Sequence, residues 1–328
     1  MTVRLVVDDL GSFRQLEPAI NTSIRLQEMS GVTVTGWDPL ADIAPAQIVI
    51  EAFAVNLPDA YVNAMAAKAI PPVWINLEYL SAESWVGEHH LLPSPHPKLP
   101  LTKHFFFPGF SPDTGGLIRE HDLLNERDAF ASSSQADNLR VFLFGYRNAA
   151  VGNLIEAMSE SQNLLRCTVP EGALATMLRQ DVGLQGDRSH GLAIETIPFV
   201  SQTDFDRLLW RHDVLFVRGE DSFVRAQWAA KPFIWQIYPQ SENVHWMKLN
   251  AFLTLYCHGL ENDAASALRE LWRAWNAEDS NNINAAWRGF RDQLPTLQAH
   301  ALAWSRKLAQ MPDLAANLLS FYQKTPKI

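Results

Sequence analysis

A short turn after an apolar run carries the residues of this sequence that are best suited to chemistry. The apolar run covers residues 214–217 and predicts a buried strand, and the turn reads Arg218, Gly219, Glu220, Asp221 and Ser222. The first amides of the helix that follows have no internal partner and favour phosphate, and an arginine beside them adds a bidentate donor. Acids and a serine are also ordinary helix caps, so the spacing alone favours a structural interpretation over a phosphate site.

Two further loops follow predicted strands and carry aromatic residues. Phe199 precedes a Ser-Gln-Thr-Asp capping box at residues 201–204, and Gln202 lies within it; the box predicts the start of a helix. Phe199 is nevertheless suited to stacking on a nucleotide base, and Gln202 to bonding the edge of the base. Phe144 and Tyr146 enclose a glycine that permits close approach of a ligand. Each signal is weak, and their shared position at strand ends is what predicts a site.

Other polar clusters predict less. Asp8 and Asp9 resemble the paired acids of metal-dependent glycosyltransferases, but a cap for the following helix is the favoured interpretation. His89, His90 and His96 have no ligand-like arrangement with acids, so no metal site is expected. The absence of G-x-G-x-x-G, P-loop and G-x-S-x-G motifs removes the usual dehydrogenase, nucleoside-triphosphatase and hydrolase interpretations.

Alternating strand-like and helix-like segments must position these residues. Strands buried on both faces are predicted at 3–7, 32–37, 47–51, 73–77, 103–107, 140–144, 164–169, 192–199, 213–217 and 233–237. Helices are predicted at 59–67, 152–161, 202–210, 222–230, 265–275, 284–293, 297–309 and 314–323. Strands separated by helices imply parallel sheets with right-handed crossovers, and two such sets imply two doubly wound α/β domains.

Turn and linker composition between residues 109 and 136 separates the two sets of segments. The predicted domains are residues 1–135, residues 136–310 and a terminal helix in 311–328 that crosses back to the first domain. Ligands of open parallel sheets bind at the carboxyl ends of the strands, so the candidate loops are expected in a cleft at those ends.

The composition limits the classes to which this protein can belong. The net charge of −9 argues against phosphate-backbone binding to nucleic acid. Two distant cysteines, no secretory leader and no apolar run of membrane length predict a soluble cytoplasmic protein.

Eight of the 11 tryptophans lie from Trp210 onward. The favoured interpretation is that they fill a helical core, and the alternative is a platform for stacking carbohydrate.

Several unusual strings support a resemblance when they are considered together. They are NLEYLSAE (76–83), LPSP (92–95), FFFPGF (105–110), TGGL (114–117), PFVSQ (198–202), FDRLLW (205–210) and RGEDSFVRAQW (218–228). With these strings the sequence resembles the EarP family of elongation factor P arginine rhamnosyltransferases, from about Val3 almost to the C-terminus.

The resemblance implies a fold, a reaction and a site. It implies two facing Rossmann-like domains of the GT-B glycosyltransferase fold, an inverting mechanism, no metal and no cofactor. The implied donor is dTDP-β-L-rhamnose and the implied acceptor is an arginine of elongation factor P, which rhamnosylation activates for rescue of ribosomes stalled at polyproline. Implied thymidine contacts are Phe144, Tyr146, Phe199 and Gln202, and implied diphosphate contacts are Arg218, Gly219, Glu220, Asp221 and Ser222.

The sequence departs from the family at its start. The family begins with a strand–loop–helix whose Asp-Asn-Tyr-Gly-Asp-Ile-Gly loop holds the general base, and no such string occurs here. The first domain is therefore expected to lack this unit, with the general-base aspartate upstream of Met1, and Glu220 becomes the best catalytic candidate that remains. Two alternatives stay open: a nucleotide-sugar-binding homologue without activity, and a sugar-nucleotide epimerase of the same fold.

Overall fold

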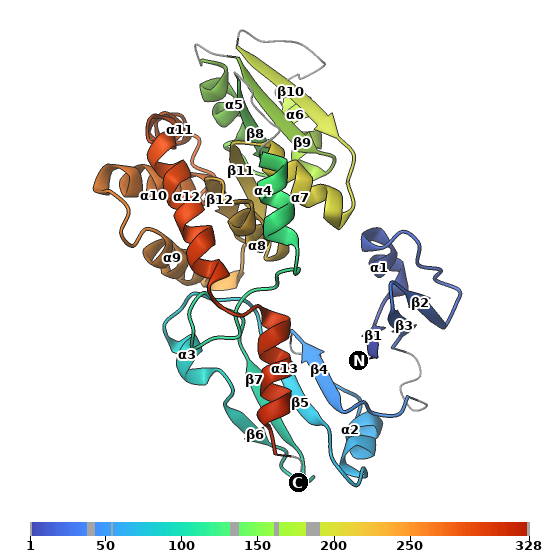
Figure 1. Cartoon of the computed structure of the whole chain (residues 1–328). Coiled ribbons are helices and arrows are strands. Elements are labelled where there is room, and N and C mark those ends of the chain that lie inside the picture. Colours follow the sequence, from blue (N-terminus) through green and yellow to red (C-terminus); the bar gives the residue numbers. More distant parts are fainter. Residues whose placement is uncertain are drawn as a thin grey trace. The chain divides into compact units, whose positions relative to one another are not determined.

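The computed structural model describes residues 2–37, 43–53, 55–131, 138–160, 164–181 and 191–326. Met1, upstream of which the general base of the family is expected, lies outside these described residues. Internal contacts divide the chain into two compact units, which are described separately (Figure 1). Unit 1 contains residues 1–79, 89–108 and 317–328, and unit 2 contains residues 80–88 and 109–316.

Unit 1 holds two small sheets. The first has the order β1 (Val3–Val7), β3 (Val32–Gly36) and β2 (Leu26–Met29), and the second has the order β4 (Ile48–Ala52), β5 (Val73–Leu77), β7 (Thr102–Phe106) and β6 (Pro93–Pro95). Among these strands β2 and β6 run antiparallel to their neighbours, and the other pairs are parallel. The predicted burial of β1 on both faces is wrong: its first three residues (3–5) are exposed.

Three of the described helices lie wholly or mostly in unit 1. They are α1 (Leu10–Leu16), α2 (Asp59–Ala66) and the later part of α13 (Leu314–Lys324). Asp9 caps α1 by accepting bonds from the amides of Gly11 and Ser12, which confirms the structural interpretation of that acid. In α13, Phe321 packs its ring against His104 and Phe106 of β7.

The division into units differs from the predicted boundaries at residues 135 and 310. The chain leaves unit 1 at Pro108, and residues 80–88 also belong to unit 2. The first division thus falls at the start of the linker-like stretch 109–136, and apolar residues anchor the beginning of that stretch: the Phe110 ring lies 5.0 Å from that of Phe252 and 6.0 Å from that of Phe223. Leu117 is buried in the same core.

Unit 2 is built on one fully parallel sheet. Its order is β10 (Leu192–Ile197), β9 (Leu165–Pro170), β8 (Leu139–Leu143), β11 (Val214–Arg218) and β12 (Phe233–Gln236). The order reverses direction at β8, because the chain first builds outward to β10 and then returns to place β11 on the other side. Such a switch point is where open parallel sheets place ligands.

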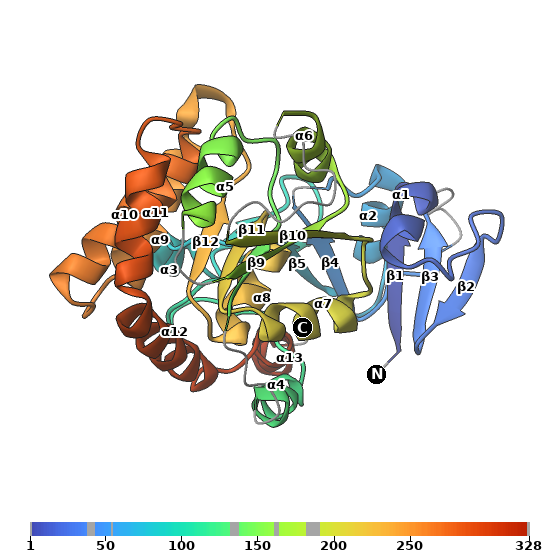
Figure 2. The same ribbon diagram turned by 90° about the horizontal axis from the view of Figure 1, so that it is seen from above.

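Helices cover both faces of this sheet. The described helices that lie wholly or mostly in unit 2 are α3 (Trp85–His89), α4 (Leu123–Ala131), α5 (Val151–Ser159), α6 (Ala173–Asp181), α7 (Gln202–Arg211), α8 (Asp221–Ala229), α9 (His245–Tyr256), α10 (Asn262–Asn276), α11 (Ile283–Asp292) and α12 (Leu294–Ala309), with a 3-10 turn at Ser241–Asn243. Figure 2 shows α5 and α6 on one side of the sheet and α7 and α8 on the other. The predicted parallel α/β architecture of this half is confirmed.

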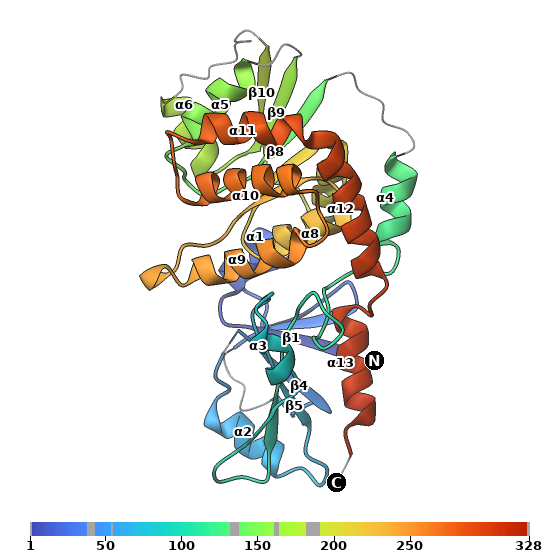
Figure 3. The ribbon, with the colours of Figure 1, turned by 90° about the vertical axis from the view of Figure 1, so that its left-hand side faces the viewer.

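Tryptophans of the later helices fill the core of unit 2. Trp272, Trp275 and Trp287 are completely buried, and the Trp275 ring lies 5.2 Å from that of Phe216 in the sheet. On α11 the buried residues recur every three or four positions, so one face of the helix packs inward, and Figure 3 shows α10 and α11 side by side. The core interpretation of these tryptophans is therefore confirmed, and none of the three is exposed for stacking on sugar.

Candidate active site

The strand ends of unit 2 bring three predicted site residues together. Phe144 and Tyr146 follow β8, and Arg218 ends β11, which is the neighbouring strand. The guanidinium carbon of Arg218 lies 4.6 Å from the centre of the Phe144 ring and 4.7 Å from that of Tyr146. Two aromatic faces thus hold one guanidinium by cation–π attraction, which leaves its N–H donors available to an anion.

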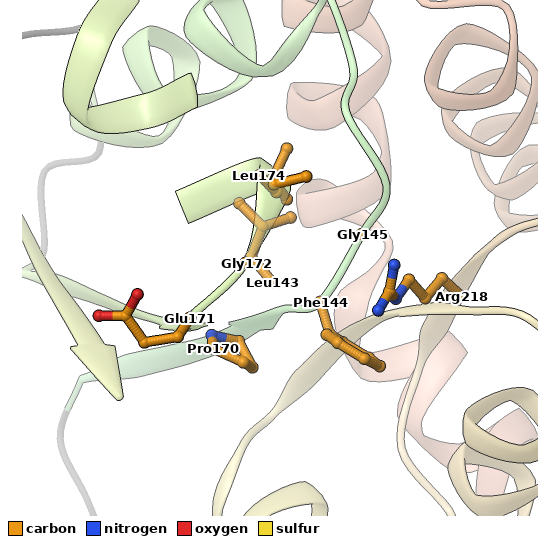
Figure 4. A pocket seen from close by; sticks show the side chains of 9 residues that line it. Leu143, Phe144, Gly145, Pro170, Glu171, Gly172, Leu174 and Arg218 are labelled. Carbon is orange, nitrogen blue, oxygen red and sulfur yellow. The ribbon is translucent and has the colours of Figure 1, made fainter. Parts of the chain in front are cut away.

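We call Arg218, Phe144 and Tyr146 together the cationic clamp. A pocket opens beside it. It is lined by residues from the ends of β8, β9 and β11, namely Leu143, Phe144, Gly145, Pro170, Glu171, Gly172, Ala173, Leu174 and Arg218 (Figure 4). Residues 170–174 were not predicted from the sequence. The signal was nevertheless present, because Pro-Glu-Gly follows the predicted strand at 164–169 and the same strand-end rule applies to it.

Phe199 and Gln202 lie at the edge of the site. Phe199 is 65% exposed, and its ring stands edge-on to Phe144 with 6.4 Å between centroids. Gln202 is the first residue of α7 and donates a 3.1 Å hydrogen bond to the Asp221 carboxylate. The capping box is confirmed, because the Ser201 hydroxyl accepts from the Asp204 amide. An exposed aromatic next to a cationic pocket is suited to stacking on a base.

The turn that starts α8 is closed by its own polar groups. Gly219 has a φ of +65°, which favours glycine, and its carbonyl accepts a 2.6 Å bond from the Trp235 indole. The buried Ser222 hydroxyl donates to the Arg218 carbonyl and accepts from the Arg218 amide at 3.1 Å. Ser222 therefore shapes the turn in this structure, and its contact with a diphosphate stays a prediction.

Replacing Gly219 with alanine tests how closely this turn meets Tyr146. The new Cβ would lie 3.3 Å from the Tyr146 hydroxyl and would keep a backbone conformation that costs about 1–2 kcal/mol for an L side chain. We expect a lower melting temperature and weaker binding of dTDP by calorimetry. Gly259→Ala is the matched control, because Gly259 has a φ of +80° with open space around it. Equal nucleotide binding in both variants would contradict the role given to Tyr146.

Tyr146 is held in place as a neutral hydrogen-bonding group. Its amide donates a 2.8 Å bond to the Gln236 side chain, and its ring meets Tyr238 edge-on at 5.6 Å. Burial raises the pKa of Tyr146, although the positive charge of Arg218 opposes this effect. The phenol therefore keeps its proton at neutral pH and remains a donor.

Glu220 is held at both carboxylate oxygens. Oε1 accepts a 2.8 Å bond from the Lys248 ammonium, and Oε2 accepts a 3.3 Å bond from the Leu80 amide. All three residues belong to unit 2. The Glu220 side chain is still 31% exposed, so a third group can reach it.

A buried arginine supports the start of α8 from behind. Arg225 is 3% exposed and forms ion pairs with Glu120 and, at 3.2 Å, with Asp206. Asp221, at 4.0 Å from Arg225, joins this network to Gln202. Burial raises the pKa of Asp206 to about 6, although Arg225 opposes the shift. The network places charges of opposite sign behind the turn.

The raised pKa of Asp206 predicts a pH-dependent stability. Its ordinary value is 3.8, so the folded state binds the proton more tightly, and this contribution to stability falls as the pH rises from 4 through 6. Asp206→Asn removes the titration. The variant is expected to gain stability relative to the unaltered chain between pH 4 and 7, by at most about 3 kcal/mol. Urea unfolding across this range measures it, with the exposed Asp263→Asn on α10 as control. A difference that does not change with pH would contradict the prediction.

The described residues also bear on the expected metal-free reaction and on membrane insertion. In those ranges no three His, Cys, Asp or Glu side chains gather as a metal site requires, and the expectation of a metal-free reaction stays a prediction. Within the same part of the chain, every helix is too short or too polar to cross a membrane.

Two α/β units, with a cationic clamp and a helix start at the strand ends of the second, define a glycosyltransferase of the GT-B class. The chain belongs to the EarP family: the family model described as "Elongation-Factor P (EF-P) rhamnosyltransferase EarP" matches residues 1–323. The resemblance found in the motifs is thereby confirmed.

Relatives and one solved structure support this membership. A protein-arginine rhamnosyltransferase of Pseudomonas putida is 47% identical, with 99% of this chain and 91% of the relative covered. One of the same name from Pseudomonas aeruginosa is 42% identical, with 98% and 90% covered. A solved structure that describes EarP-mediated arginine glycosylation of translation elongation factor EF-P has a TM-score of 0.66 at 34% identity, with 99% of this chain and 98% of that chain covered.

The fractions of the chains that these matches cover do not confirm the predicted loss of a strand–loop–helix unit. The match reaches 98% of the solved EarP chain. An incomplete first domain is therefore not supported by the comparison with the solved structure. The placement of the general base upstream of Met1 stays a prediction.

Proposed function

We propose that this chain is an inverting glycosyltransferase that moves rhamnose from dTDP-β-L-rhamnose to an arginine side chain of elongation factor P. The observation that carries the proposal is the Arg218 guanidinium, held between Phe144 and Tyr146 at the start of α8. The names of the relatives support the acceptor and the sugar. A translation factor as substrate also favours a cytoplasmic location.

The proposal includes a mode of donor binding. The diphosphate is placed at the first amides of α8, where helix dipole and Arg218 both favour negative charge. The thymine base is placed against Phe144 and the exposed Phe199, with Gln202 at its edge. The acidic net charge of the chain agrees with a small anionic ligand held at one local cationic site rather than with nucleic acid.

The transfer forms one bond and breaks one. A guanidinium nitrogen of the acceptor attacks the anomeric carbon of rhamnose, the bond from that carbon to the β-phosphate oxygen breaks, and dTDP leaves with the electron pair. Arg218 and the α8 amides stabilise the charge that develops on the leaving diphosphate. The attacking guanidinium must lose a proton, and its high pKa requires a carboxylate that orients it. Glu220 is the candidate carboxylate in unit 2.

Mass spectrometry of elongation factor P tests the proposal. The factor is incubated with dTDP-rhamnose and this chain, and its peptides are sequenced. Gain of one deoxyhexose on an arginine is the expected result. Binding of donor without transfer would instead favour an inactive homologue, and conversion of the free donor without change to the protein would favour an epimerase. Either result would overturn the proposed function.

A further inference from the structure

Acidic residues at the start of α8 present a difficulty for any anion site there. Glu220 occupies the cap position of the helix and Asp221 is its first residue. Two negative charges at a helix N-terminus normally interact with the amides that a phosphate needs, and they repel the phosphate directly. The chain must direct both carboxylates elsewhere if the turn is to hold a diphosphate.

The structure shows where each carboxylate goes. Glu220 makes no side-chain cap bond to α8, and its Oε1 atom instead meets the Lys248 ammonium at 2.8 Å. The Leu80 amide occupies its Oε2 atom. Asp221 turns toward Gln202, at 3.1 Å, and toward Arg225, at 4.0 Å. Both acids are thus engaged by partners outside the first amides of the helix.

The position of Lys248 allows it to fix the direction of the Glu220 carboxylate. It lies on α9, which begins nine residues after β12 ends, and its side chain is only 19% exposed. A partly buried ion pair is less screened by solvent than a surface pair, so the lysine both neutralises Glu220 and fixes its direction. The carboxylate retains its exposed part for a third partner.

We propose that Lys248 is a positioning residue of this enzyme: it holds Glu220 away from the α8 amides, so that these amides bind the donor diphosphate and the carboxylate faces the reacting groups. The proposal rests on the proposed function. Without Lys248, Glu220 is expected to turn toward the amides as an ordinary cap and to compete with the diphosphate. The lysine thus acts through Glu220 and needs no contact with substrate.

A double-mutant cycle tests this dependence. Affinity for dTDP is measured by calorimetry for the unaltered chain, Lys248→Met, Glu220→Gln and the double variant. Lys248→Met alone is expected to weaken dTDP binding by about tenfold, because a competing charge is released. In the Glu220→Gln background the same change is expected to have an effect of about twofold or less, because no charge remains to compete. Lys248→Arg should restore most of the affinity.

Controls separate this effect from general loss of structure. Lys307→Met removes a lysine of α12 that lies over the Trp304 ring, and it should leave dTDP affinity unchanged. Melting temperatures are recorded for all variants, and Lys248→Gln replaces Lys248→Met if the latter does not fold. If Lys248→Met only destabilised the fold, it would lower the melting temperature and the dTDP affinity equally in the unaltered and the Glu220→Gln backgrounds, and the expected difference between the two backgrounds would not appear.

Two results would overturn the inference. One is an equal loss of dTDP affinity with and without the Glu220 carboxylate, which would mean that Lys248 acts directly or through the fold. The other is unchanged affinity and turnover in Lys248→Met. Because nucleotide binding is measured without acceptor, the cycle can succeed even if no rhamnose is transferred, so the proposed function can fail separately. Failure of the unaltered chain to bind dTDP would overturn both.

Discussion

Arg218→Ala is expected to lower kcat/KM for rhamnose transfer by on the order of a thousandfold. The guanidinium is the cation held by the Phe144 and Tyr146 rings, and in the proposed reaction it stabilises the charge that develops on the leaving diphosphate. Its loss therefore removes both a donor contact in the ground state and stabilisation of the transition state. Calorimetry with dTDP and timed mass spectrometry of elongation factor P separate these two effects.

The conservative replacement gives the sharper result. Arg218→Lys keeps the charge but loses the planar group that stacks between two rings and donates two parallel bonds, so we expect it to recover little activity. Arg207→Ala is the matched control, because Arg207 is half exposed on α7 and pairs only weakly with Asp204 at 3.8 Å. Full activity of Arg218→Lys would mean that charge alone matters, and full activity of Arg218→Ala would remove the site from this turn.

Glu220→Gln is expected to lower kcat by about a hundredfold while dTDP affinity is kept or slightly increased. The amide preserves the size of the side chain but cannot accept a proton, and it removes one negative charge from the start of α8. Single-turnover measurements with saturating donor isolate the chemical step. A large loss of dTDP affinity would instead indicate that the carboxylate shapes the nucleotide site.

Replacing a second glutamate shows whether the loss of turnover is specific to Glu220. Glu156→Gln changes an exposed residue of α5 and should leave both kcat and dTDP affinity unchanged. Unchanged turnover in Glu220→Gln, with Glu156→Gln also normal, would exclude Glu220 from the reaction and would move the catalytic carboxylate to unit 1. The proposed role of Lys248 in turnover would then fail as well.

Local patterns predicted the elements of unit 2 closely. The apolar run at 233–237 became β12 (Phe233–Gln236), and the Ser201 capping box marked the start of α7 at Gln202. Such runs are reliable because a strand buried on both faces leaves few places for polar residues. Parallel topology then made the site predictable, since the carboxyl ends of neighbouring strands must meet. Phe144, Tyr146 and Arg218 follow from this rule and do lie together.

Other elements were missed for identifiable reasons. β6 carries Pro93 and Pro95, which argue against a strand, and it is tolerated because it lies at the edge of its sheet. The glycines and serines of the segment from Gly109 predict a linker, although Phe110 anchors it in the unit 2 core. Such residues are decided by what packs against them, which composition does not record.

The sequence by itself determined the family, the parallel α/β class and the three residues of the cationic clamp, because these follow from local patterns, motifs and the periodicity of strands. Only the tertiary structure decided how the acids at the start of α8 are directed. Glu220 and Lys248 are 28 residues apart, and no local pattern links them. Their contact exists because β12 and α9 pack where they do, and the free energy of that packing is shared by the whole core of the unit.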